Sequence, residues 1–93
     1  MNEQLLLMGS LSNDLLRVAN SVARGSEKAA QNFWNSGQVW LNDLLKYPNK
    51  TYIEKILLDL QNDHFSATDK VKAEKYLMQS ILLQNAALHF HDQ

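Results

Sequence analysis

The chain has 93 residues, of which 45% are hydrophobic, and its net charge is −1. This near-neutral balance excludes a strongly basic surface for nucleic acid, and the absence of cysteine excludes disulfides and cysteine zinc sites. No apolar run approaches the roughly 20 residues that a membrane-spanning helix needs. We therefore expect one domain over residues 1–93, in the cytoplasm, with no membrane span and no nucleic-acid partner.

The first predicted helix covers residues 3–24. Its apolar residues share one arc at helical spacing, and they are Leu5, Met8, Leu11, Leu15, Val18, Ala19 and Val22. Gly25 and Ser26 then favour a helix end followed by a new N-cap. An alternative stays open, because the arc of residues 29–45 continues that of the first helix. One unbroken helix of about 42 residues would be roughly 60 Å long and would need a second chain to cover it.

The second predicted helix, residues 27–46, carries both tryptophans of the chain. Phe33, Gly37, Trp40 and Leu44 form one stripe, and Trp34 flanks it. We expect this stripe to be core, with Trp40 and Leu44 packed against Ile56 or Leu60 and against Leu77 or Ile81. The alternative is a ligand slot near Trp34, Trp40 and Gly37, in which the glycine would provide space beside the aromatic rings.

Tyr47-Pro48-Asn49 ends this helix, because proline disfavours helical geometry at the residue before it. A capping-box pattern at Thr51–Glu54 opens a third helix, residues 51–62, and a second such pattern at Ser66–Asp69 opens the last, residues 67–90. The sequence thus predicts an all-α fold: a small bundle of four helices at about 3–24, 27–46, 51–62 and 67–90.

The last predicted helix has two apolar faces. The larger face is expected to join the core, and it comprises Val71, Leu77, Met78, Ile81, Leu82 and Leu88. The strip opposite contains Tyr76, Leu83, Ala87 and Phe90. With few elements left to cover it, this strip is predicted to be the interface of a homodimer. The alternative is a monomer in which the first helix lies across the strip.

Two polar residues, Glu74 and Asn85, fall within the larger apolar arc of that helix. In the simpler interpretation Glu74 reaches water near the helix end and Asn85 bonds a neighbouring group. In the alternative interpretation they fix the register of an interface, as buried asparagines do in coiled coils.

No catalytic constellation occurs among the ionisable residues. His89, His91 and Asp92 could hold a metal only loosely, so a solvated tail is expected there. Asp59 and Asp63 are expected on a solvated helix face, and His64 has no nucleophile beside it in the sequence. We therefore expect no enzyme activity, cofactor or metal. The sequence favours a non-catalytic protein-interaction module: a small homodimeric adaptor, assembly or regulatory protein. The alternative is a ligand-binding or enzymatic bundle with its pocket near the tryptophans.

Overall fold

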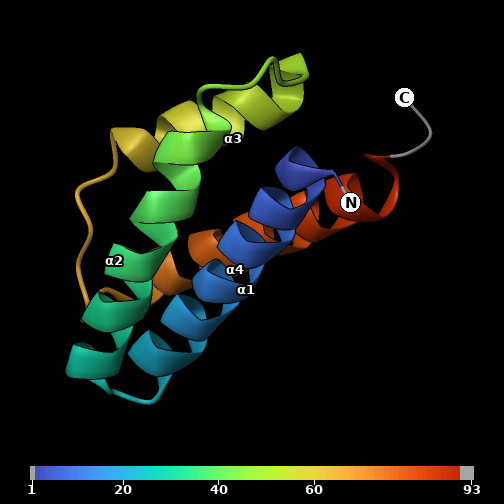
Figure 1. Cartoon of the computed structure of the whole chain (residues 1–93). Helices are drawn as coiled ribbons and strands as arrows, with labels where there is room; N and C mark the ends of the chain where they lie inside the picture. The colour runs from blue at the N-terminus through green and yellow to red at the C-terminus, as the bar shows by residue number, and fades with distance from the viewer. Residues whose placement is uncertain (1, 91–93) are drawn as a thin grey trace.

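The computed structural model describes residues 2–90, and these form four helices and no strand. In chain order they are α1 (Glu3–Ala23), α2 (Glu27–Leu44), α3 (Thr51–Gln61) and α4 (Lys70–Leu88), as Figure 1 shows. This confirms the predicted all-α bundle of four helices. The first three helices begin where expected, whereas α4 begins at Lys70 rather than at residue 67. Each helix ends slightly earlier than the sequence predicts.

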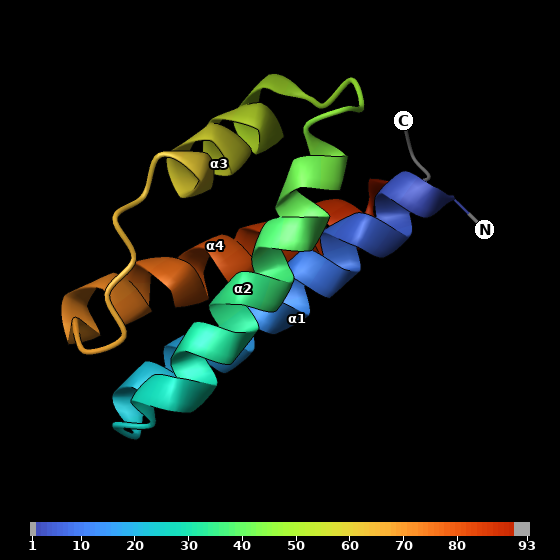
Figure 2. The same ribbon diagram turned by 60° about the vertical axis from the view of Figure 1, so that its left-hand side comes forward.

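α1 lies at the centre of the molecule, with α2 along one side and α4 along the other (Figures 1 and 2). α4 runs antiparallel to α1, while the shorter α3 packs across α2 and α4. The resulting body measures 38 × 22 × 20 Å. Because two helices flank α1, it is buried over much of its circumference. Leu7, Asp14 and Ser21 are buried although they fall outside the predicted apolar arc.

The chain turns sharply between α1 and α2, so the single long helix considered above does not form. Gly25 has a φ of +77°, which L-residues with a side chain rarely adopt. Two backbone hydrogen bonds close the turn: Gly25 N–H donates to Val22 O, and Ser26 N–H donates to Ser21 O at 2.8 Å. This glycine therefore separates the helices and brings α2 back along α1.

The helix starts differ from the predicted capping boxes. Asn2 caps α1, and Asp69 caps α4 by accepting from the backbone N–H groups of Val71 and Lys72. Ser66 instead accepts from Thr68 N–H in the loop before the helix, which explains the later start of α4. The N-terminus of α3 has no side-chain cap, because Thr51 already lies inside the helix.

The two faces of α4 are the reverse of the expected arrangement. The helix buries Ala73, Tyr76, Gln79, Ser80, Leu83 and Ala86. α1 lies along this face, as expected in the alternative in which the first helix covers the strip of a monomer. The reason is close helix approach. Ser12 Oγ donates to Ser80 O and Ser80 Oγ donates to Ser12 O, each at 2.8 Å. Such reciprocal bonds between small residues hold α1 and α4 at short range, which the bulkier opposite face could not permit.

Trp34 is the buried tryptophan, at 8% exposure. Its ring stacks on Phe65 with centroids 4.6 Å apart, and Tyr76 lies tilted against both rings. Trp40 is half-buried, and its Nε1–H donates to Asp14 Oδ2 at 2.8 Å. Leu44 and Leu60 belong to the same core, as predicted. The expected packing of Trp40 on Leu77 or Ile81 is wrong, because those side chains lie on the exposed face of α4.

Candidate interaction surface

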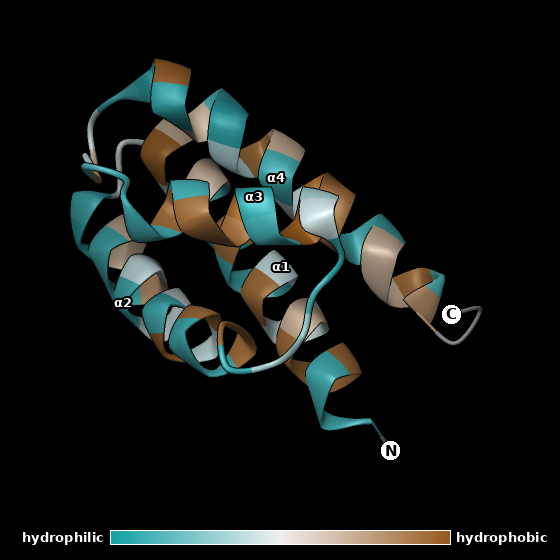
Figure 3. Cartoon of the chain, turned by 90° about the horizontal axis from the view of Figure 1, so that it is seen from above, coloured by the Kyte–Doolittle hydropathy of each residue, from teal (hydrophilic) through white to brown (hydrophobic). Residues whose placement is uncertain are grey.

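The exposed face of α4 holds six of the eleven large apolar side chains that are exposed within residues 2–90. Its large apolar side chains are between 39% and 78% exposed, and they are Val71, Leu77, Met78, Ile81, Leu82 and Leu88. Figure 3 shows hydrophobic segments recurring along the whole of α4. Scattered single apolar residues are ordinary on protein surfaces, but apolar residues that recur along one face of a helix are typical of a contact surface.

α1 extends this surface with Leu6 and Leu16, which are 54% and 39% exposed. Shallow hollows follow the groove between the two helices. One hollow is lined by Leu6, Gly9 and Leu88, among others, and the next by Leu16 and Ile81. A third lies at the far end of the groove, beside Ala23, Glu74 and Leu77. The groove thus runs nearly the full length of both helices, a shape that suits another helix. We call the exposed residues of α4 and the α1 side of this groove the outer face.

Charge is absent from the part of the outer face where the C-terminal part of α4 lies beside the N-terminal half of α1. Residues 77–88 of α4 contain no Asp, Glu, Lys or Arg, and neither do residues 4–13 of α1. These two stretches lie side by side because the helices are antiparallel. Depletion of charged residues is characteristic of the buried part of protein interfaces.

Glu74 and Asn85, the two polar residues within the larger apolar arc of α4, lie on this outer face. Glu74 and Asn85 are both exposed, and within residues 2–90 neither side chain has a hydrogen-bond or ion-pair partner. Gln84 is also exposed, but its Oε1 accepts from Ser12 Oγ at 3.4 Å. The desolvation cost that burial in the core would impose on Glu74 therefore does not arise in the isolated chain.

The predicted interface strip is mostly core. Tyr76 and Leu83 are fully buried against the rest of the chain, and Ala87 and Phe90 are partly buried against the same core. The sequence predicts two apolar faces on α4, but the structure buries the strip and exposes the larger face. Only the small residues Ala73, Ser80 and Ala86 on the strip side signalled close helix packing, since small side chains let two backbones approach.

A polar network fixes the buried side of α4 to the end of α3. The Asp63 side chain is only 4% exposed; it accepts from the Tyr76 hydroxyl and pairs with Lys72 and Lys75 at 3.5 and 3.4 Å. Burial alone would raise the pKa of Asp63, but the Tyr76 hydrogen bond and the two cations outweigh it and lower this pKa. Burial, together with the same carboxylate, raises the pKa of Tyr76. The solvated face expected for Asp63 is therefore wrong, and the network stabilises the fold.

The tryptophan pocket considered from the sequence is filled by side chains. Trp34 is stacked on Phe65, and a Cβ added to Gly37 would lie 3.6 Å from both Asp14 Cβ and Leu11 Cδ1. Trp40 lines only a shallow hollow on the surface between α1 and α2. These residues therefore do not enclose a ligand cavity.

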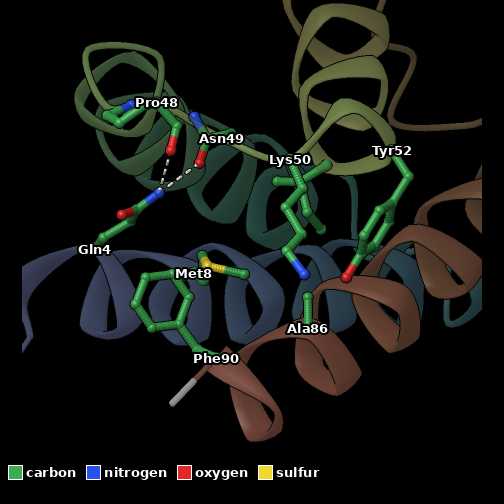
Figure 4. A pocket seen from close by; sticks show the side chains of 9 residues that line it. Gln4, Met8, Pro48, Asn49, Lys50, Tyr52, Ala86 and Phe90 are labelled. Atoms are coloured by element: carbon green, nitrogen blue, oxygen red, sulfur yellow. Dashed lines mark hydrogen bonds between the residues drawn. The ribbon is translucent and has the colours of Figure 1, made fainter. Parts of the chain in front are cut away.

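A different hollow lies between the ends of α1, α3 and α4 (Figure 4). Met8, Ala86 and Phe90 form its apolar side, while Lys50 and Tyr52 extend toward it from the start of α3. Its volume is about 180 Å³. That is below the roughly 300 Å³ at which pockets for small molecules usually begin. The outer face is therefore the stronger candidate site.

No family model, curated protein or solved structure matches this chain. Between residues 2 and 90, no cluster of three or more His, Cys, Asp or Glu side chains could hold a metal ion. His91 and Asp92 lie outside the described residues. None of the four helices described is long and apolar enough to cross a membrane.

Proposed function

We propose that this protein is a non-catalytic protein-interaction module that acts as a homodimer, in the manner of a small adaptor, assembly or regulatory protein. The observation that carries the proposal is the outer face: a row of exposed apolar residues on α4, beside a groove shared with α1 that contains no charged residue along 77–88 and 4–13. The cytoplasmic location expected from the sequence stays a prediction.

The energetics of apolar burial support an interface here. Full burial of one Leu, Ile or Met side chain contributes about 1.5–3 kcal/mol relative to full exposure. The side chains of Met78, Ile81 and Leu88 are each at least half exposed in the single chain. A partner that covered this row would gain several such contributions at once, and it would meet few charges that need desolvation.

The test places a charge in the centre of the outer face. Ile81→Glu should convert a dimer into a monomer, because the new carboxylate would lose its hydration at the interface. Leu58→Glu is the matched control, since Leu58 is 41% exposed on α3 and Ile81 is 50% exposed on α4. Sedimentation equilibrium at tens of micromolar gives the mass, and far-UV circular dichroism checks the fold.

We expect the wild type and Leu58→Glu to sediment as dimers, and Ile81→Glu to sediment as a folded monomer. A dimer that survives Ile81→Glu but dissociates with Leu58→Glu would move the interface to α3. A wild-type mass equal to that of one chain, with no change in either variant, would oppose self-association.

A further inference from the structure

The outer face of α4 contains a regular heptad seam. Its members are separated alternately by four and three residues, the spacing of core positions in a coiled coil, and they are Lys70, Glu74, Leu77, Ile81, Gln84 and Leu88. All six side chains are exposed in the single chain. A seam of this kind is complete only when a second helix packs against it.

The order of residues along the seam is self-complementary in an antiparallel pair. If Leu77 lies opposite Ile81 of a second copy, the same register places Glu74 opposite Gln84 of that copy. It also places Lys70 opposite Leu88, near the C-terminal end of the other α4. The apolar residues then meet at the two-fold axis and the polar residues meet on either side of it.

The polar groups of the seam fit each other in this register. The carboxylate of Glu74 has no partner within residues 2–90. Gln84 directs its Oε1 at Ser12, which leaves its Nε2–H groups as donors. A hydrogen bond from this amide to a carboxylate is charge-assisted and therefore stronger than a neutral one. Lys70 would lie beside the negative end of the second helix, which favours a cation.

The same groups argue against other pairings. Parallel packing would place Glu74 beside Glu74 and Lys70 beside Lys70. Repulsion between these like charges opposes that arrangement. Within one chain, Glu74 and Gln84 are ten residues apart on a helix, or about 15 Å, so they cannot bond to each other. The seam therefore matches an antiparallel copy of itself better than a parallel one.

We infer that two copies of this chain pair through α4 in an antiparallel, two-fold arrangement, with Gln84 of each copy donating to Glu74 of the other. This inference rests on the proposed function and specifies its partner and register. It assigns Glu74 and Gln84 as the residues that set specificity, while Leu77 and Ile81 supply apolar contact at the axis.

The test compares opposite charges at position 84, with and without the Glu74 carboxylate. Gln84→Lys should lower the dimer dissociation constant by about two- to thirtyfold, because symmetry creates two exposed ion pairs. Gln84→Glu should raise it by a similar factor. In a Glu74→Gln background the two variants should have similar dissociation constants. Sedimentation equilibrium measures each value.

Cysteine cross-linking tests the helix direction independently, since the natural chain has no cysteine. A mixture of Leu77→Cys and Ile81→Cys chains should oxidise mainly to the mixed dimer, whereas a parallel pair would give Leu77→Cys homodimers. The register is wrong if the Gln84 variants shift the dissociation constant in the same direction, or if their difference persists without Glu74. Failure of the proposed function is distinct, because Ile81→Glu would then leave the mass unchanged.

Discussion

The side chain of Asp63 is buried, although its place in the sequence predicts a solvated carboxylate. Asp63 follows α3 in a short connection, where a carboxylate is usually solvated, yet its side chain is 4% exposed. Such burial is tolerated only because a hydroxyl and two ammonium groups surround it. The Tyr76 hydroxyl is the group that links this carboxylate to the aromatic contacts of Trp34 and Phe65.

We expect Tyr76→Phe to lower the free energy of unfolding by about 1–3 kcal/mol at pH 7, because Asp63 would lose a buried donor. The loss should shrink on acidification. The pKa of Asp63 is lowered in the fold, so its stabilising contribution is complete above the unfolded value of about 3.9 and disappears as the pH falls through the folded value.

Urea unfolding of both proteins between pH 7 and pH 2.5 checks this prediction. Tyr52→Phe is the control, because Tyr52 is 51% exposed on α3 and its hydroxyl forms no hydrogen bond within residues 2–90. A difference between wild type and Tyr76→Phe that stays constant across this pH range would show that the hydrogen bond does not depend on the Asp63 charge.

At the scale of the helices, replacing each of two glycines by alanine should change the free energy of unfolding in opposite directions. Gly25 forms the turn between α1 and α2 at a φ of +77°, where a Cβ is strained. Gly37 lies inside α2, and an added Cβ would make ordinary contacts of 3.6 Å with α1. α1 therefore approaches α2 closely at Gly37 but leaves space for one methyl group.

We predict that Gly37→Ala raises the free energy of unfolding by about 0.5–1 kcal/mol through helix propensity. Gly25→Ala should lower it by about 1–2 kcal/mol, because an L-residue is disfavoured in the left-handed region. Thermal or urea unfolding measures both. Destabilisation by Gly37→Ala would mean that α1 and α2 cannot accommodate the methyl group at 3.6 Å.

The helices themselves could be predicted from local signals, and their packing could not. Pro48, Gly25 and the apolar periodicity of α1 determine where helices begin and end, and these are properties of the chain near each residue. Which side of α4 is buried depends on the neighbouring helix that covers it. Leu77 and Ile81 are more apolar than Ser80 and Ala73, yet only the smaller pair lets α1 approach closely. The periodicity of α4 therefore predicts its larger apolar face as core, whereas the structure leaves that face exposed.

The molecule as a whole is organised around α1, which packs along α2 and α4 together. Its inward residues Leu11, Val18 and Val22 are at most 1% exposed. α3 is the shortest helix of the described chain and reaches the core through Ile53, Leu57 and Leu60. Elements with fewer buried contacts open at lower free energy, so the molecule should open first at α3 and last at α1.

Native-state hydrogen exchange should therefore show the strongest amide protection in the centre of α1 and the weakest helical protection in α3. Leu57→Ala provides a matched perturbation, because Leu57 is fully buried and its truncation should cost about 2–5 kcal/mol. If α3 opens as a separate unit, this variant should accelerate exchange in α3 while the amides of α1 retain most of their protection. Equal acceleration in α1 and α3 would show instead that the four helices open together, and that α3 is as firmly joined to the bundle as α4.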